Sequence, residues 1–316
     1  MPPPRAHLAG TLQLLKRMES LSGRHPYAGP LWRFLDRPQD LPARVAPERA
    51  TFKYDAYLAC SPGRRAWGVA VSDRYEGVGM IPPLQRMVAA MPGQYDLQPA
   101  LRLQQTLGRG DLVVAVGFDH PERPPRIKLY LQESVWDTGL GTGAELAAAL
   151  SRAAPGSTVP EWCLGRQIHV VTVSLLADGS RQLKMYLGGP TPSEAAEGAP
   201  REVLPLVEQL AAASPLGGGW YYLTVRCRPG RPWRYAINKI YNAVQLGFTA
   251  PPPGAADAWA DVAALFESAG TTSSLHALYG AFRGSGLVAL PTATALEGDG
   301  DQTDIYLAAW AGGEQR

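Results

Sequence analysis

A recurring triplet of one polar, one apolar and one aromatic residue is the feature of this 316-residue sequence best suited to chemistry. It occurs five times, as Arg65-Ala66-Trp67, Lys128-Leu129-Tyr130, Lys184-Met185-Tyr186, Lys239-Ile240-Tyr241 and Asp304-Ile305-Tyr306. Lysine and arginine donate charge-assisted hydrogen bonds to the oxygens of multiply charged anions. Aromatic faces attract cations through the ring quadrupole. The triplets therefore predict a site where an anion such as diphosphate lies beside a carbocation.

Strand geometry would bring the two functional members of each triplet to the same surface. Positions i and i+2 of a strand share a face, so the polar and aromatic residues lie together while the apolar residue faces the other way. Arg126, two positions before Lys128, adds a cation to that face. A single copy is more simply explained as a solvated strand fragment. Five copies are not, because a solvated face would leave no sheet surface for helices to cover.

Each triplet lies in the second of two strand-like runs joined by a turn. The most secure pair is 167–176 with 181–189, because Asp178-Gly179 between them is a strong hairpin signal. Pro291 weakens the ninth run, 287–296. The predicted pairs are 50–60 with 64–73, 111–120 with 126–134, 167–176 with 181–189, 220–227 with 234–244, and 287–296 with 303–310.

Helical stretches separate the hairpins and complete a repeated unit. Apolar residues recur at helical spacing in 98–108, 144–154, 201–214, 257–270 and 273–282. Five consecutive hairpins indicate an antiparallel meander, and ten strands can close on themselves to remove exposed edges. We therefore predict an α+β protein: a ten-stranded antiparallel β-barrel with an outer ring of helices, in five αββα repeats. Residues 1–316 form one domain, with an N-terminal helix and cap over 1–50 and the barrel over 51–312.

Composition excludes several other classes of protein. The formal net charge is +2, so nothing global attracts nucleic acid or an anionic membrane. The N-terminus lacks the apolar core of a signal peptide, and no run of about 18 apolar residues occurs. Three scattered cysteines give neither zinc spacing nor a disulfide framework. We expect a cytoplasmic protein without a metal site.

The αββα units, the Lys-x-Tyr triplets and the arginine in the second strand resemble the ABBA-fold (PT-barrel) aromatic prenyltransferases, over the chain from about residue 50 onward. The sequence is most similar to the indole (dimethylallyltryptophan synthase-like) and cyanobactin peptide branches. The resemblance implies that cations bind the diphosphate and that aromatic rings shield the carbocation. The implied diphosphate ligands are Arg65, Lys128, Lys184 and Lys239, with Arg126 and Arg226 as additions, and the implied shield is Trp67, Tyr130, Tyr186, Tyr241 and Tyr306.

The resemblance also implies a carboxylate on the first strand, close to the acceptor. Asp55 in FKYDAYL occupies that position and is the candidate base that removes the proton lost on aromatic substitution. The alternative is a surface aspartate near a strand end. Asp304 departs from the cationic pattern, and it could contact the acceptor or lie outside the diphosphate region.

The leading hypothesis is an enzyme, a prenyltransferase that transfers a dimethylallyl or geranyl group from its diphosphate to an indole, phenol or imidazole ring of a small metabolite or a peptide side chain. No DDxxD cluster occurs, so magnesium is not required, although it could assist diphosphate binding. No other cofactor is implied. The rival hypothesis is a non-catalytic barrel that binds an anionic or lipidic ligand. The sequence leaves acceptor identity, prenyl chain length, regiochemistry and oligomeric state open.

Overall fold

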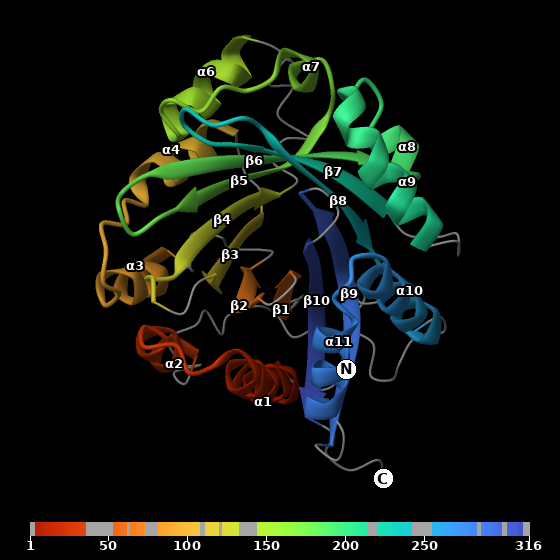
Figure 1. Cartoon of the computed structure of the whole chain (residues 1–316). Helices are drawn as coiled ribbons and strands as arrows, with labels where there is room; N and C mark the ends of the chain where they lie inside the picture. Colours follow the sequence, from red (N-terminus) through yellow and green to blue (C-terminus); the bar gives the residue numbers. More distant parts are fainter. Residues whose placement is uncertain are drawn as a thin grey trace.

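Ten antiparallel strands close into a barrel in the computed structural model of the chain (Figure 1). The structure describes residues 4–35, 53–61, 64–73, 81–107, 111–119, 122–132, 144–213, 220–241, 255–282, 286–298 and 302–311. The strands are β1 (Lys53–Ser61), β2 (Arg64–Asp73), β3 (Asp111–Phe118), β4 (Arg126–Gln132), β5 (Ile168–Leu175), β6 (Arg181–Gly189), β7 (Trp220–Cys227), β8 (Arg234–Ile240), β9 (Leu287–Glu297) and β10 (Gln302–Ala311).

Each strand pairs with its neighbours in the chain, and the first strand pairs with the last. β1 lies between β2 and β10, and the register places Tyr57 opposite both Gly68 and Tyr306. This pairing closes the sheet, so the described strands leave no exposed edge. The predicted meander of five hairpins and its closure are confirmed.

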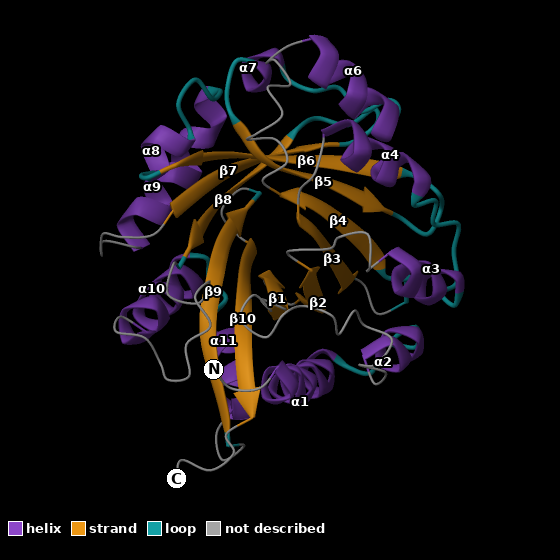
Figure 2. Cartoon of the chain, turned by 180° about the vertical axis from the view of Figure 1, so that it is seen from behind, coloured by secondary structure: helices purple, strands orange, loops and turns teal. Residues whose placement is uncertain are grey.

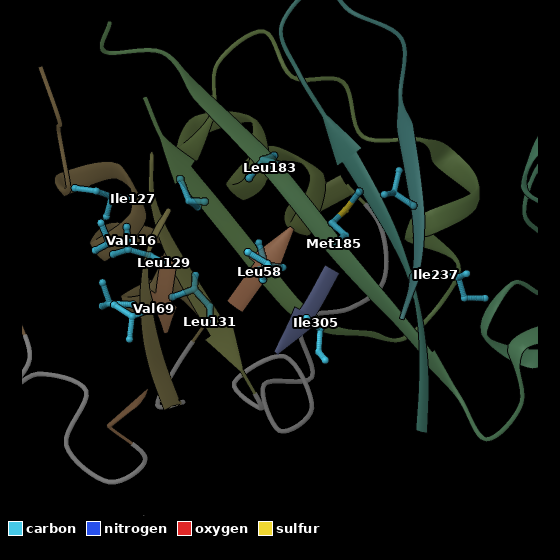
Figure 3. Packing of buried hydrophobic residues seen from close by; sticks show 14 of the residues in the cluster. Leu58, Val69, Val116, Ile127, Leu129, Leu131, Leu183, Met185, Ile237 and Ile305 are labelled. Atoms are coloured by element: carbon cyan, nitrogen blue, oxygen red, sulfur yellow. The ribbon is translucent and has the colours of Figure 1, made fainter. Parts of the chain in front are cut away.

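Helices surround the barrel as an outer layer (Figures 1 and 2). They cover the outward face of the sheet, where each strand presents apolar side chains such as Leu129, Met185 and Ile305 (Figure 3). This is the layer that the helical spacing predicts. The helices are α1 (Pro4–Ser22), α2 (Gly29–Leu35), α3 (Ile81–Ala89), α4 (Gln98–Leu107), α6 (Ala144–Ala153), α7 (Glu161–Leu164), α8 (Pro192–Ala195), η1 (Arg201–Val203), α9 (Leu204–Ala213), α10 (Ala255–Ser268) and α11 (Thr272–Phe282).

The β5–β6 turn forms as its sequence predicts. Gly179 adopts φ +82°, a left-handed conformation that glycine accepts without steric cost. The Asp178 carboxylate accepts hydrogen bonds from the backbone N–H of Ser180 at 2.9 Å and from its hydroxyl at 2.6 Å. These local bonds fix the turn and hence the register of β5 against β6.

The N-terminal helices pack on the side of the barrel. α1 contacts β1, β2 and β10, and Trp32 of α2 stacks on Trp67 of β2 with ring centroids 6.0 Å apart. The predicted cap over residues 1–50 stays a prediction.

Pro291 lies within β9 and does not end that strand. The pairing of β9 with β10 shifts register between Tyr306 and Leu307, which pair with Ala293 and Pro291 respectively. A bulge of this kind accommodates a proline that cannot donate to the ladder.

Candidate active site

A cavity of about 230 Å³ opens inside the barrel, at the end where the hairpin turns lie. Its lining residues lie close to four of those turns: Ser61 at the end of β1, Asp119 after β3, Arg228 after β7 and Gln302 at the start of β10. Six cationic and three acidic side chains line the same space, so the cavity carries an excess of positive charge. We call the six the cation layer: Arg126, Lys128, Lys184, Arg226, Arg228 and Arg234.

The two lysines of the cation layer form no salt bridge within the described part of the chain. Lys184 Nζ lies 5.3 Å from the ring centroid of Tyr186, and Lys128 Nζ lies 4.6 Å from that of Tyr57. Burial and the neighbouring Arg126 lower the pKa of Lys128 to about 7. Burial likewise lowers the pKa of Lys184, although Glu297 opposes the shift. An anion entering the cavity would relieve this unfavourable environment.

Two arginines of the cation layer are already paired with carboxylates. Arg126 Nη2 lies 2.6 Å from Asp119 Oδ2. Arg226 holds Glu297 through two contacts, one of them a hydrogen bond of 2.8 Å from Nη2 to Oε2. Burial alone would raise the pKa values of Asp119 and Glu297, but the surrounding cations outweigh it and lower both. The pairs fix the guanidinium groups in position before any ligand arrives.

Four tyrosines line the cavity beside these cations, and we call them the tyrosine layer: Tyr57, Tyr130, Tyr186 and Tyr306. Tyr57 and Tyr306 have ring centroids 5.4 Å apart, and Tyr130 and Tyr186 are 6.2 Å apart. Burial raises the pKa of Tyr186 to about 12, and it raises those of the other three as well. All four hydroxyls therefore keep their protons at neutral pH.

The aromatic surface continues beyond the tyrosine layer. Tyr222 of β7 meets the edge of Tyr186 at 5.9 Å, and His169 of β5 contacts both Tyr222 and Trp220 at 5.7 and 5.9 Å between centroids. Burial lowers the pKa of His169, with Arg166 contributing, so the imidazole is neutral near neutral pH. A continuous aromatic wall therefore extends from the cation layer toward the opposite end of the barrel.

Tyr57 has room because two neighbouring strands carry glycine beside it. A Cβ added at Gly68 would lie 2.6 Å from the Tyr57 ring and 2.1 Å from the carbonyl oxygen of Val116. A Cβ added at Gly117 would lie 1.8 Å from the Tyr57 hydroxyl. The two glycines therefore let a bulky ring lie flat against the barrel wall.

Three of the five triplets contribute to the cavity as predicted. Lys128 and Lys184 lie there with Tyr130, Tyr186 and Tyr306, and Asp304 lines the same space. The two cations suggested as additions, Arg126 and Arg226, lie there as well.

The first triplet faces the helices, so its predicted placement is wrong. Arg65 donates from Nε to Ser274 Oγ of α11 at 3.0 Å and from Nη1 to the carbonyl of Leu21 at 3.4 Å. Trp67 stacks on Phe118 at 4.5 Å in the outer core. In β2 the residues that point inward are the opposite set from the predicted one, because the small residues Ala66 and Gly68 occupy the crowded inner face.

The fourth triplet is also placed wrongly by the sequence. Lys239 is 2% exposed and forms a salt bridge with Asp261 of α10, outside the barrel wall. Tyr241, which the prediction assigned to the shield, lies 5.4 Å from Lys239 Nζ and has its hydroxyl 3.4 Å from that of Thr294. On β8 the inward positions belong to Arg234, which lines the cavity, and to Asn238, which lies on the same face of the strand.

Asp55, the predicted base, belongs to β1 and pairs with Ala70 and Ala308. It precedes Tyr57, a cavity residue, by two positions on the same strand. Its side chain lies outside the described residues, so its role stays a prediction.

Several cavity residues were not predicted from the sequence. Tyr57 follows Asp55 by the two-residue spacing that brings strand residues to one face, which was an available signal. Arg228 and Arg234 follow Arg226 in a basic stretch around the β7–β8 turn. Asp119 and Glu297 had no comparable signal, because their importance comes from arginines on other strands.

This geometry can hold a multiply charged anion against fixed cations while aromatic rings surround the group attached to it. Charge that develops on the anion would be stabilised by dipoles and cations already in place. Positive charge that develops on the attached group would face ring surfaces. Within the described ranges, no group of three or more His, Cys, Asp or Glu side chains is arranged to hold a metal ion.

The fold is that of the prenyltransferase barrel, and solved structures share it over nearly their whole length. One is 5-dimethylallyl tryptophan synthase from Streptomyces coelicolor in complex with DMASPP and Trp, with 17% identity, TM-score 0.68, and coverage of 98% of this chain and 97% of that one. PriB in a binary complex with product diphosphate has 18% identity, TM-score 0.63, and coverage of 96% and 95%. NotF in complex with brevianamide F and DMSPP has 12% identity, TM-score 0.65, and coverage of 98% and 96%.

No protein-family model and no curated protein matches the sequence. At the identities above, the likeness establishes the fold. None of the helices in the described ranges is long and apolar enough to cross a membrane.

Proposed function

We propose that this chain is an aromatic prenyltransferase, which transfers a dimethylallyl or geranyl group from its diphosphate to an electron-rich aromatic ring of a small metabolite or a peptide. The observation that carries this proposal is that the cation layer and the tyrosine layer line a single cavity. An anion site alone would serve many functions. An anion site bordered by four neutral tyrosines suits a reaction that separates an anion from a carbocation.

The diphosphate of the donor would bind to the cation layer. Lys128 and Lys184 supply charge that no salt bridge in the described part of the chain offsets, while Arg126 and Arg226 are held in place by their carboxylates. Binding would then require little rearrangement, because the guanidinium groups are already ordered.

Ionisation of the donor would follow from this arrangement. The carbon–oxygen bond breaks, its electron pair goes to the diphosphate oxygen, and an allylic carbocation remains beside the tyrosine layer. Tyr57, Tyr130, Tyr186 and Tyr306 present ring faces to the cation and exclude water that would capture it. The aromatic acceptor then attacks the carbocation and forms the new carbon–carbon or carbon–heteroatom bond.

Rearomatisation releases one proton from the acceptor, and Asp55 is the proposed base that takes it. The position of Asp55 supports this assignment, since it lies on the strand that carries Tyr57 and two residues away from it. The overall reaction consumes an allylic diphosphate and an aromatic compound, and it yields the prenylated product, diphosphate and a proton.

The solved structures with this fold support the same reaction class. One is a dimethylallyl tryptophan synthase bound to DMASPP and Trp, and another is a complex with product diphosphate. Three buried free cysteines, Cys60, Cys163 and Cys227, further support a reducing compartment, so we infer a cytoplasmic enzyme. The cavity offers binding for the donor without a metal, and magnesium would act only as an aid.

A mass-spectrometric screen tests the proposed function. The purified protein is incubated with dimethylallyl or geranyl diphosphate and with tryptophan, tyrosine, simple phenols and aromatic peptides, with and without magnesium. We expect an acceptor whose mass rises by one prenyl group. Tight binding of diphosphate with no product from any pair would instead support the non-catalytic barrel.

Asp55→Asn then tests the base once an acceptor is known. We expect the turnover rate to fall by about 100-fold while the Kd for inorganic diphosphate is unchanged, since general-base catalysis contributes about 10²–10⁴-fold. Asp96→Asn, which removes a half-exposed carboxylate outside the barrel, is the matched control. A comparable loss of diphosphate affinity in Asp55→Asn would contradict the assignment.

A further inference from the structure

Asp304 of β10 differs from the other two carboxylates of the cavity. Asp119 and Glu297 are each paired with an arginine. Asp304 is 7% exposed, and its one hydrogen bond within the described ranges comes from the neutral amide of Gln302, at 3.1 Å from Nε2 to Oδ1. Among the described residues it is therefore a buried carboxyl group without a salt bridge, beside the cation layer.

The charge state of Asp304 follows from this environment. An ionised carboxylate that is buried and unpaired is costly, and such groups take up a proton instead. Burial raises the pKa of Asp304, and the nearby charge of Glu297 raises it further. Lys184 and Lys128 face it from β6 and β4 and act in the opposite direction without cancelling that shift. Cys60, Tyr57 and Tyr306 are further titratable neighbours, and burial keeps all three neutral.

We propose that Asp304 is a neutral carboxylic acid that donates a hydrogen bond to the diphosphate of the donor. Because Oδ1 accepts from Gln302, the proton belongs on Oδ2, the oxygen left for the cavity. This inference rests on the proposed function, because it assumes that a diphosphate occupies the cavity. It makes Asp304 a catalytic residue that contacts the leaving group, alongside the cations.

The proposal has a consequence for binding at different pH values. When Asp304 is neutral it donates to a diphosphate oxygen, and when it is ionised it repels the same oxygen. Diphosphate affinity should therefore fall as pH rises through the pKa of Asp304. Lys128, with a pKa of about 7, also loses its charge as pH rises, and this loss weakens binding too. An experiment must separate these two groups.

Calorimetric titration with inorganic diphosphate, from about pH 5 to about pH 9, provides the test. Asp304→Asn keeps a neutral hydrogen-bond donor that cannot ionise, and Asp304→Ala removes the donor. We expect Asp304→Asn to match the wild-type affinity at the acid end and to bind progressively tighter than the wild type at the alkaline end. We expect Asp304→Ala to bind about tenfold more weakly at the acid end, the size of one hydrogen bond to a charged group.

Two controls isolate the contribution of Asp304 to the pH dependence. Asp96→Asn, at a surface salt bridge with Arg181, should leave the Kd unchanged at every pH. The comparison of wild-type Asp304 with Asp304→Asn is repeated in a Lys128→Met background. There, too, Asp304→Asn should bind diphosphate more tightly at the alkaline end. If Asp304→Ala does not fold, the Asn series alone decides.

Several outcomes would overturn the proposal. Asp304→Asn binding tighter by one constant factor at all pH values would mean that Asp304 is ionised throughout. Equal affinities for Asp304→Asn and the wild type at every pH would mean that its charge state does not affect the ligand. Loss of the difference in the Lys128→Met background would assign the pH effect to Lys128. Failure of the wild-type protein to bind diphosphate at all would instead contradict the proposed function.

Discussion

Two lysines that begin the same Lys-x-Tyr motif have opposite environments in this molecule. Lys184 and Lys239 each begin a Lys-x-Tyr triplet in the second strand of a hairpin. Lys184 lines the cavity and forms no salt bridge within the described part of the chain, whereas Lys239 is fully buried against α10 and paired with Asp261. Under the proposed function Lys184 binds an exchangeable anion, whereas Lys239 has a permanent one in Asp261.

The difference shows that the pattern of the whole strand, and not of one triplet, determines whether a side chain points into the barrel or toward the helices. On β6 the outward face carries Leu183, Met185 and Leu187, so Lys184 faces the cavity. On β8 the outward face carries Tyr235 and Ile237, and Lys239 shares their parity. The larger apolar side chains determine which face meets the helices, and the lysine follows.

The largest expected effect is on protein stability, and it comes from substituting Lys239. Lys239→Met should lower the free energy of unfolding by about 3–5 kcal/mol, because it leaves Asp261 charged and buried. Urea denaturation followed by circular dichroism measures this. The double variant Lys239→Met/Asp261→Leu should recover most of the loss, and failure to recover would show that the pair itself is not the cause.

Lys184→Met should have the opposite profile. We expect the affinity for inorganic diphosphate to fall by about 100-fold, roughly 2.7 kcal/mol, because a close charge–charge contact is lost. Unfolding of the unliganded protein should be unchanged or shifted to higher urea, since burial of this ammonium group is unfavourable. A variant that loses both stability and binding would remove the contrast with Lys239.

A smaller difference in stability is expected between glycine-to-alanine substitutions on the inner face of the barrel and on an outer helix. Gly68→Ala places a methyl group against Val116 and Tyr57, and it should cost about 1–3 kcal/mol in unfolding free energy. Gly280→Ala on α11 has open space and should instead stabilise the protein by up to about 1 kcal/mol. Thermal melts of both variants test the comparison, which fails if Gly68→Ala is neutral.

The repeating pattern of hairpins and helices was enough to predict the barrel, because each unit must bury one face against the next layer. The sequence also placed Lys128, Lys184, Tyr130 and Tyr186 correctly. It misplaced Arg65 and Lys239, since a three-residue window does not record the phase of the strand. It did not indicate the Arg226–Glu297 pair, because that contact joins β7 to β9 over the intervening strand β8. Interactions between strands that are not neighbours depend on how the barrel closes and on the stagger between its strands, and local sequence spacing encodes neither.

The pairing of β1 with β10 also constrains how the chain reaches its native state. Tyr57 meets Tyr306 only after the chain has been synthesised through β10, and α1 packs against β10 as well. Until then the ladder groups of β1 that later bind β10 have no partner, so a nascent chain exposes an open edge on which other chains could assemble. Contacts between residues this far apart in the sequence form slowly during folding. Ring closure is therefore the folding step that removes this exposed edge.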